Sequence, residues 1–140
     1  MLSDKVKLET KYDEARKLFH VKTILKTHEH LSLKKGVIYY MVSDEEILKI
    51  NRETLNHDYY TDIITFDYET DDDIEDNELV ISWDRIKDNA KKLGEPLVRE
   101  LHRVCIHGML HLAGYSDYTE KEKIIMREQE NQFLDLYCST

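Results

Sequence analysis

The chain has 140 residues, of which 41% are hydrophobic and 35% are charged, and its formal net charge is −9 at pH 7. This length and apolar content predict a single domain over residues 1–140, and no apolar run approaches the ~20 residues of a bilayer-spanning helix. The acidic balance argues against an unaided binder of polyanions, although residues 1–35 hold nine Lys and Arg against five Asp and Glu, which form either a basic face or a solvated helix surface.

Strands and helices are expected to alternate along the first part of the chain. Residues 5–9 predict a short strand, and apolar residues at helical spacing predict a helix within residues 12–31. The β-rich run GVIYYMV, residues 36–42, predicts a second strand. A capping box at Ser43 then predicts a helix that ends near residue 55.

Two further strands are predicted in the middle of the chain, at residues 63–68 and 78–82. The acidic stretch between them lacks the spacing and the glycine of a calcium loop, so we interpret it as a mobile, solvated loop. Ser82 is suited to cap a helix over residues 83–93, which Gly94 is suited to end.

Residues 97–113 are apolar around most of a helical circumference, as expected of a central, largely buried helix. Thr119 and Glu122 form a second capping box before a final helix. The apolar side chains that this helix is expected to bury are Ile124, Ile125, Phe133 and Leu136. Strands separated by helices indicate a layered α/β or α+β domain.

Two features predict a cytoplasmic protein. The first ten residues, MLSDKVKLET, lack the apolar segment of a secretory signal. Cys105 and Cys138 are the only cysteines, and their separation matches no metal or redox motif, as expected of free thiols in a reducing compartment.

The segment HGMLHLAGYSD, residues 107–117, predicts a transition-metal site. His107 and His111 lie four residues apart, so on a helix they share one face and can both reach one ion. Gly114 can adopt the left-handed conformation that ends a helix, which allows Asp117 to turn back as a third ligand. Three protein ligands leave one position open for a water, the expected catalytic group, whose pKa the ion lowers toward ~7.

Zinc, one ion per chain, is the metal that this ligand set favours, while nickel, iron and manganese remain alternatives. Two imidazoles buried on one helix face need either separate partners or one shared ion, and a shared ion is the simpler solution. The other histidines are expected to have ordinary hydrogen-bonding roles; they are His20, His28, His30, His57 and His102.

The histidine spacing also matches that of metzincin proteases, whose signature is HExxHxxGxxH. Those enzymes place a glutamate directly after the first histidine, where it serves as the general base. In this chain Gly108 occupies that position, so peptide hydrolysis lacks its proton shuttle. We therefore expect no protease activity.

Several segments together resemble the YbeY family of bacterial metal-dependent endoribonucleases. HGMLHLAGY is similar to the family signature HGxLHLxGYDH, TDIITF to the TDVLSF strand, and ELVIS to a GDI-type strand. Met126 and Glu130 stand where the family has a Met and a Glu in its last helix. The resemblance extends over residues 37–136, and its histidine motif is highly specific.

This resemblance implies an α+β fold, a small mixed β-sheet packed with helices, in which the metal-binding helix is central. It also implies single-strand-specific endoribonuclease activity in 16S rRNA 3′-end maturation and ribosome quality control, with RNA and the small ribosomal subunit as partners. The alternative from another class is a metal-stabilised ribosome-assembly factor with little or no nuclease activity.

The chain departs from the family pattern at three places. Asp117 stands where the family usually has a third His, and Ser116 where it has an Asp. Leu55 occupies the position of a family Arg, a candidate phosphate contact, and Arg52 lies about one helical turn earlier. The short amino terminus predicts a trimmed first strand.

Three residues near the motif have two possible roles each. Tyr115 is suited either to stack on a base or to pack at the end of the helix. Asp62 and Thr65 are expected to support the site from the neighbouring strand, the alternative being that they simply end it.

Overall fold

The structure, a computed structural model, describes residues 5–56 and 61–138, and within them the strands form one mixed sheet. The sheet order is β1-β2-β4-β3, where β1–β2 and β2–β4 are parallel and β3–β4 is antiparallel. The strand bounds are Val6–Thr10 for β1, Gly36–Val42 for β2, Ile63–Phe66 for β3 and Asp76–Ser82 for β4. The first strand is present, and β1 pairs with β2 along all five of its residues.

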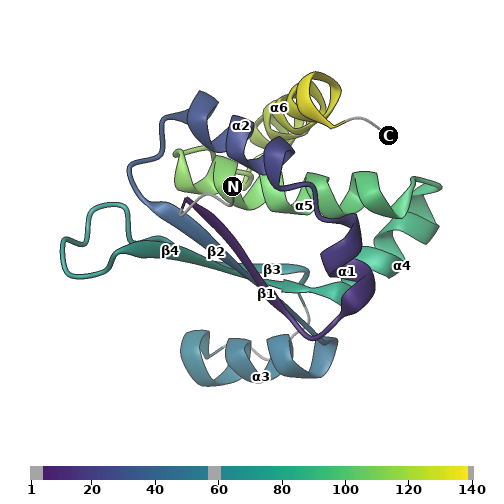
Figure 1. Ribbon diagram of the computed structural model, residues 1–140, viewed down its shortest axis with the longest axis horizontal. Coiled ribbons are helices and arrows are strands. Elements are labelled where there is room, and N and C mark those ends of the chain that lie inside the picture. Colours follow the sequence, from purple (N-terminus) through teal and green to yellow (C-terminus); the bar gives the residue numbers. More distant parts are fainter. Residues whose placement is uncertain (1–4, 57–60, 139–140) are drawn as a thin grey trace.

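Helices cover both faces of this sheet (Figure 1). Their bounds are Asp13–Leu18 for α1, Val21–Leu31 for α2, Asp44–Leu55 for α3, Trp83–Leu93 for α4, Leu97–Leu112 for α5 and Glu120–Tyr137 for α6. Helix α3 lies alone on one face, whereas α2, α5 and α6 lie on the other, with α5 between the sheet and the outer helices (Figure 1). This arrangement confirms the α+β fold, the small mixed sheet and the central position of the predicted metal helix.

Two apolar cores follow from these layers. The larger core lies between the sheet and the helices around α5, and it includes Tyr39, Leu79, Ile106 and Met109. A smaller cluster under α3 contains Ile47, Ile64 and Val80. Alternate residues of a strand point to opposite faces, so Leu79 and Val80 enter different cores. None of the helices in the described segments is long and apolar enough to cross a membrane.

The helix predicted within residues 12–31 is two helices, because the chain is extended at Phe19 and His20. The backbone N–H of His20 donates to His102 Nε2 at 2.8 Å, a partner on α5 that is 82 residues away. His102 Nδ1 in turn lies 2.6 Å from the carbonyl oxygen of Val98. A neutral imidazole that donates from Nδ1 and accepts at Nε2 therefore joins the α1–α2 corner to α5.

This buried imidazole predicts a loss of stability in acid. Burial lowers the pKa of His102 to about 4, and the nearby His20 adds to this effect, although the hydrogen bond to Val98 opposes it. In the unfolded chain the pKa is 6.5, so the unfolded state takes up a proton that the folded state does not. The folded state therefore has its full stability above pH 6.5. As pH falls from 6.5 toward 4, the free energy of unfolding decreases by about 3 kcal/mol.

Chemical denaturation of the metal-free protein at pH 7 and pH 4 measures this loss. We expect the free energy of unfolding to fall by about 3 kcal/mol less in His102→Gln than in the wild type, since an amide does not titrate. His30→Gln changes an exposed histidine and is expected to keep the wild-type pH dependence. Equal pH dependence in all three proteins would show that His102 is not the responsible group.

The final helix buries a different stripe from the one expected. Ile124, Ile125 and Leu136 are exposed, and of the four predicted residues only Phe133 is buried. The buried side chains of α6 are Met126, Glu130, Phe133 and Leu134. Glu130 lies four residues after Met126, and three and four residues before Phe133 and Leu134, so the four side chains form one continuous face. This face includes an acidic residue that the apolar pattern did not predict.

Candidate metal centre

The centre begins on α5, which packs closely on the sheet. A Cβ atom at Gly108 would lie 2.8 Å from Ile63 Cδ1 and 2.9 Å from Leu79 Cδ1, so a glycine allows α5 to approach β3 and β4. Gly108 thus faces the sheet, whereas His107 and His111 project together from another side of the same helix. Their Nε2 atoms are 3.0 Å apart, and both side chains are partly exposed.

The turn after α5 brings the third residue back to the histidines. Gly114 has a φ of 102°, its N–H donates to the His111 carbonyl, and the Tyr115 N–H donates to the Leu110 carbonyl. These two bonds form a Schellman motif, which ends the helix and reverses the chain. Asp117 Oδ2 consequently lies 3.4 Å from His107 Nε2 and 3.6 Å from His111 Nε2.

In both histidines the ring proton is fixed on Nδ1, the nitrogen that faces away from Asp117. His107 Nδ1 lies 2.7 Å from Glu130 Oε2, and His111 Nδ1 lies 3.1 Å from the carbonyl oxygen of Tyr115. An ionised carboxylate and a carbonyl only accept hydrogen bonds, so each Nδ1 must be a donor. In the neutral rings each Nε2 therefore carries a lone pair, and the two lone pairs face each other and the Asp117 carboxylate.

This donor set fits a tetrahedral transition-metal ion. Ligand atoms bound to zinc at ~2.0–2.1 Å stand about 3.3–3.4 Å apart in a tetrahedron. The three separations between His107, His111 and Asp117 are 3.0, 3.4 and 3.6 Å. An ion at their centre would relieve the contact between lone pairs and leave a fourth position open. The structure thus brings together all three residues that the sequence predicts as ligands.

A buried cluster of charged residues fixes the position of His107. Glu130 is only 3% exposed, and Arg103 is 6% exposed. The Arg103 guanidinium lies 3.2 Å from Glu100 Oε1, 3.7 Å from Glu130 Oε1 and 2.7 Å from Asn131 Oδ1. Glu130 is thereby held between His107 and a cation, which fixes the orientation of its carboxylate.

The electrostatic environment of the centre favours positive charge. Burial by itself lowers the pKa of His107, but the hydrogen bond to Glu130 and the charges of Glu130, Asp62 and Asp117 outweigh it and raise the pKa. Burial raises the pKa of the Asp62 carboxyl, although the charge of His107 opposes this. A site that retains a proton in this way is also suited to a bound cation.

The remaining predicted residues are placed as follows. Tyr115 is packed against the main core, and its carbonyl orients His111. Asp62 lies close to His107, whereas Thr65 lies within β3 opposite Leu79. Leu55 is an exposed residue at the end of α3. His57, for which an ordinary role was expected, lies outside the described residues.

Sequence reasoning missed the role of Glu130 and Arg103 at the centre. The signal for Glu130 was its position four residues after Met126 and three before Phe133, on the buried stripe of α6. An acidic residue on such a stripe needs a buried partner, and here the partners are His107 and Arg103. The signal for Arg103 was similar, a cation on the almost wholly buried α5.

The fold and this centre define a small α+β protein with an open, metal-type site of two histidines and one aspartate on its central helix. The chain belongs to the YbeY family, since the family model described as Endoribonuclease YbeY matches residues 3–137. An RNA endonuclease role is supported by this membership.

Three relatives named Endoribonuclease YbeY illustrate the similarity. The chain is 50% identical over 100 residues to the relative from Phocaeicola vulgatus, and the match covers 71% of this chain and 72% of the relative. It is 46% identical over 114 residues to that of Cytophaga hutchinsonii, covering 81% and 78% of the two chains. It is 51% identical over 98 residues to that of Bacteroides thetaiotaomicron, covering 70% and 71%.

The fold is also similar to a solved structure, the solution structure of TM1509 from Thermotoga maritima. The TM-score is 0.61 at 24% sequence identity, and the match covers 93% of this chain and 87% of that one. This likeness concerns the fold, in agreement with the mixed sheet and helices described above.

Proposed function

We propose that the chain is a single-strand-specific, zinc-dependent endoribonuclease that acts in 16S rRNA 3′-end maturation and ribosome quality control. The observation that carries this proposal is the convergence of His107 Nε2, His111 Nε2 and Asp117 Oδ2 on one point, in a chain of the YbeY family. RNA and the small ribosomal subunit are the proposed partners, and the cytoplasm is the proposed location.

The residues of this centre have two roles: three of them would hold the ion, and two others orient the histidines. His107, His111 and Asp117 would hold one zinc ion, which supplies a water of lowered pKa and offsets negative charge on the phosphoryl oxygens. Glu130 keeps the His107 proton on Nδ1, and the Tyr115 carbonyl does the same for His111. Both Nε2 atoms are thus available to the ion without rearrangement of the rings.

A second candidate function is that of a metal-stabilised ribosome-assembly factor with little or no nuclease activity. It is favoured by the exposed Leu55, which stands where the family has an Arg suited to contact a phosphate. The net charge of −9 also favours it, because polyanions are repelled at long range. Both functions use the same metal centre, so cleavage of RNA is what separates them.

The test is cleavage of labelled RNA by purified, zinc-loaded protein that is free of contaminating ribonuclease. We expect cleavage of single-stranded RNA, much slower cleavage of the same sequence as a duplex, and no cleavage of an unstructured peptide. His111→Ala is expected to abolish cleavage, since it removes one of three ligands. An inactive wild type with a full complement of zinc would favour the assembly factor, and His111-dependent peptide cleavage would favour a protease.

A further inference from the structure

A cavity of about 320 Å³ opens beside the metal centre, between α4, α5 and α6. His107 and Glu130 border it on one side, and the apolar side chains of Leu93 and Val104 form another part of its wall. Leu93 is 55% exposed, so its side chain is accessible to a group that enters the cavity. This volume is within the range of small-molecule sites, so the cavity can accept a group about as large as a nucleotide.

The rim of the cavity carries two exposed cations. The side chains of Lys92 and Arg127 are 70% and 53% exposed, respectively. Lys92 Nζ lies 2.9 Å from Asp88, and Arg127 Nε lies 3.6 Å from Glu130. The Lys92–Asp88 pair is exposed on both sides and therefore weak, so Lys92 can turn toward a phosphate at small cost, whereas Arg127 stays paired with the buried Glu130 and adds positive charge at the rim.

The floor of the cavity has a different character. Arg103 is already paired there with Glu100 and Glu130, and Asp62 also lines the cavity, so a phosphate inside would meet three carboxylates. A phosphate is therefore favoured at the rim, and an uncharged base or ribose is favoured inside, against Leu93 and Val104.

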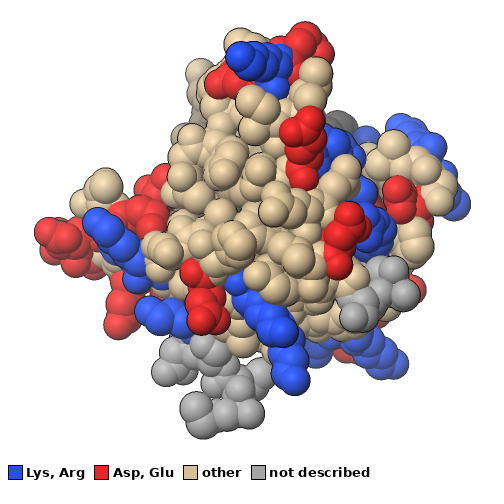
Figure 2. Space-filling view, turned by 90° about the horizontal axis from the view of Figure 1, so that it is seen from above, with Lys and Arg blue, Asp and Glu red and all other residues tan. Residues whose placement is uncertain are grey.

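The charge distribution of the whole molecule supports this placement. Figure 2 shows acidic side chains gathered at the end where the chain between β3 and β4 projects, and Lys and Arg more frequent at the opposite end, where Figure 1 places α4. A polyanion that approaches this acidic chain is thus directed to the end that contains α4. Lys92 stands on that helix, next to the cavity.

We propose that this cavity binds one nucleotide of single-stranded RNA next to the scissile phosphodiester. Its phosphate lies at the rim formed by Lys92 and Arg127, and its base lies against Leu93. The inference rests on the proposed endoribonuclease function and adds the path of the substrate strand, which runs from the metal centre into the cavity beside His107.

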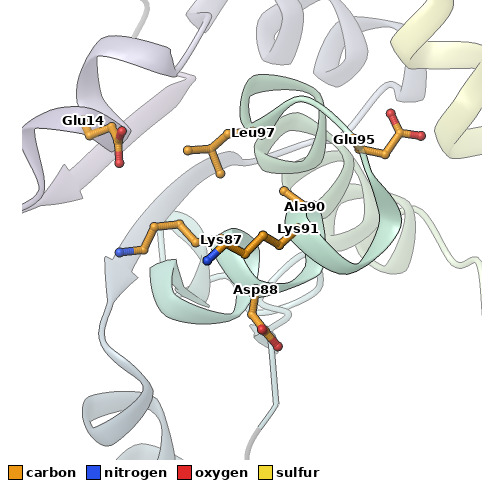
Figure 3. A pocket seen from close by; sticks show the side chains of 7 residues that line it. All are labelled: Glu14, Lys87, Asp88, Ala90, Lys91, Glu95 and Leu97. Carbon is orange, nitrogen blue, oxygen red and sulfur yellow. The ribbon is translucent and has the colours of Figure 1, made fainter.

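The experiment measures KM and kcat for cleavage of single-stranded RNA over a range of salt concentrations. Lys92→Gln removes the rim cation, and Lys91→Gln is the matched control, because Lys91 is its neighbour on α4 but lines a separate pocket with Lys87 and Leu97 (Figure 3). Arg127 is left unchanged, because loss of its contact with Glu130 would disturb His107 as well. Leu93→Ala removes the apolar wall without a change of charge.

We expect Lys92→Gln to raise KM about five- to twentyfold with kcat and zinc content near wild type. The plot of log(kcat/KM) against log salt should become shallower by about 0.7, the value for one phosphate contact with a single strand. Lys91→Gln should change neither quantity by more than about twofold. Leu93→Ala should raise KM and keep the wild-type salt dependence, because no charge is lost.

The results distinguish failure of this inference from failure of the proposed function. If the wild type cleaves RNA while Lys92→Gln behaves as Lys91→Gln does, the strand does not pass through the cavity. If Leu93→Ala keeps the wild-type KM, the base does not lie against Leu93. If the zinc-loaded wild type does not cleave RNA, the endoribonuclease function fails, and the substrate path fails with it.

Discussion

Replacing Asp117 by asparagine is expected to weaken zinc binding by more than about 100-fold, beyond the loss typical for outer partners of a metal site, and to abolish RNA cleavage. Asparagine has nearly the same shape, but it offers the ion a neutral and poorer oxygen. Asp117→His should restore a good ligand of the type usual in the family, and it should retain zinc and part of the activity. Equilibrium competition with a zinc chelator measures the affinities.

A local role for Asp117 in capping α6 predicts different results. In the structure that cap is Thr119, whose side chain accepts the Glu122 N–H at 3.0 Å, while Glu122 accepts the Thr119 N–H at 2.9 Å. Asp117 is thus not needed as the cap, and Asp117→Asn should leave the free energy of unfolding of the metal-free protein within ~0.5 kcal/mol of wild type. Unchanged zinc affinity in Asp117→Asn would show that the third ligand is another residue.

Glu130→Gln is expected to weaken zinc binding by about 10- to 100-fold, although Glu130 does not itself face the ion. The glutamate holds His107 through a 2.7 Å hydrogen bond from Nδ1, and its charge makes the ring a stronger donor to the ion. A glutamine can still accept this bond, but it lacks the charge, and it leaves Arg103 with one carboxylate fewer.

The matched control is Glu128→Gln, which makes the same chemical change at an exposed position of α6. We expect wild-type zinc affinity for this variant. Zinc affinity and the free energy of unfolding of the metal-free protein are measured on both variants, since a purely structural role would lower only the second. Wild-type zinc affinity in a destabilised Glu130→Gln would limit this residue to holding α5 and α6 together.

Much of the fold could be predicted because its signals are local. The capping boxes at Ser43 and Thr119 begin α3 and α6, and α4 runs from its Ser82 cap to Gly94. The break between α1 and α2 could not be predicted in this way, because His20 is held by His102 on α5. No pattern within residues 12–31 encodes that partner.

The same distinction applies to the metal centre. His107, His111 and Asp117 lie within eleven residues, so helix pitch and the Gly114 turn suffice to bring them together. Glu130 belongs to another helix, 23 residues beyond His107, and its role depends on how α6 is rotated against α5. The apolar pattern of α6 indicated the wrong rotation, because Ile124 and Ile125 are exposed while Glu130 is buried.

The most direct test of the metal centre is a zinc titration of the chelated protein, with the rate of single-stranded RNA cleavage measured at each addition. We expect no cleavage without metal, a linear rise, and a plateau at one zinc ion per chain, with His111→Ala inactive throughout. Cleavage by the metal-free protein, or zinc-dependent cleavage by His111→Ala, would contradict the assignment of this centre to RNA hydrolysis.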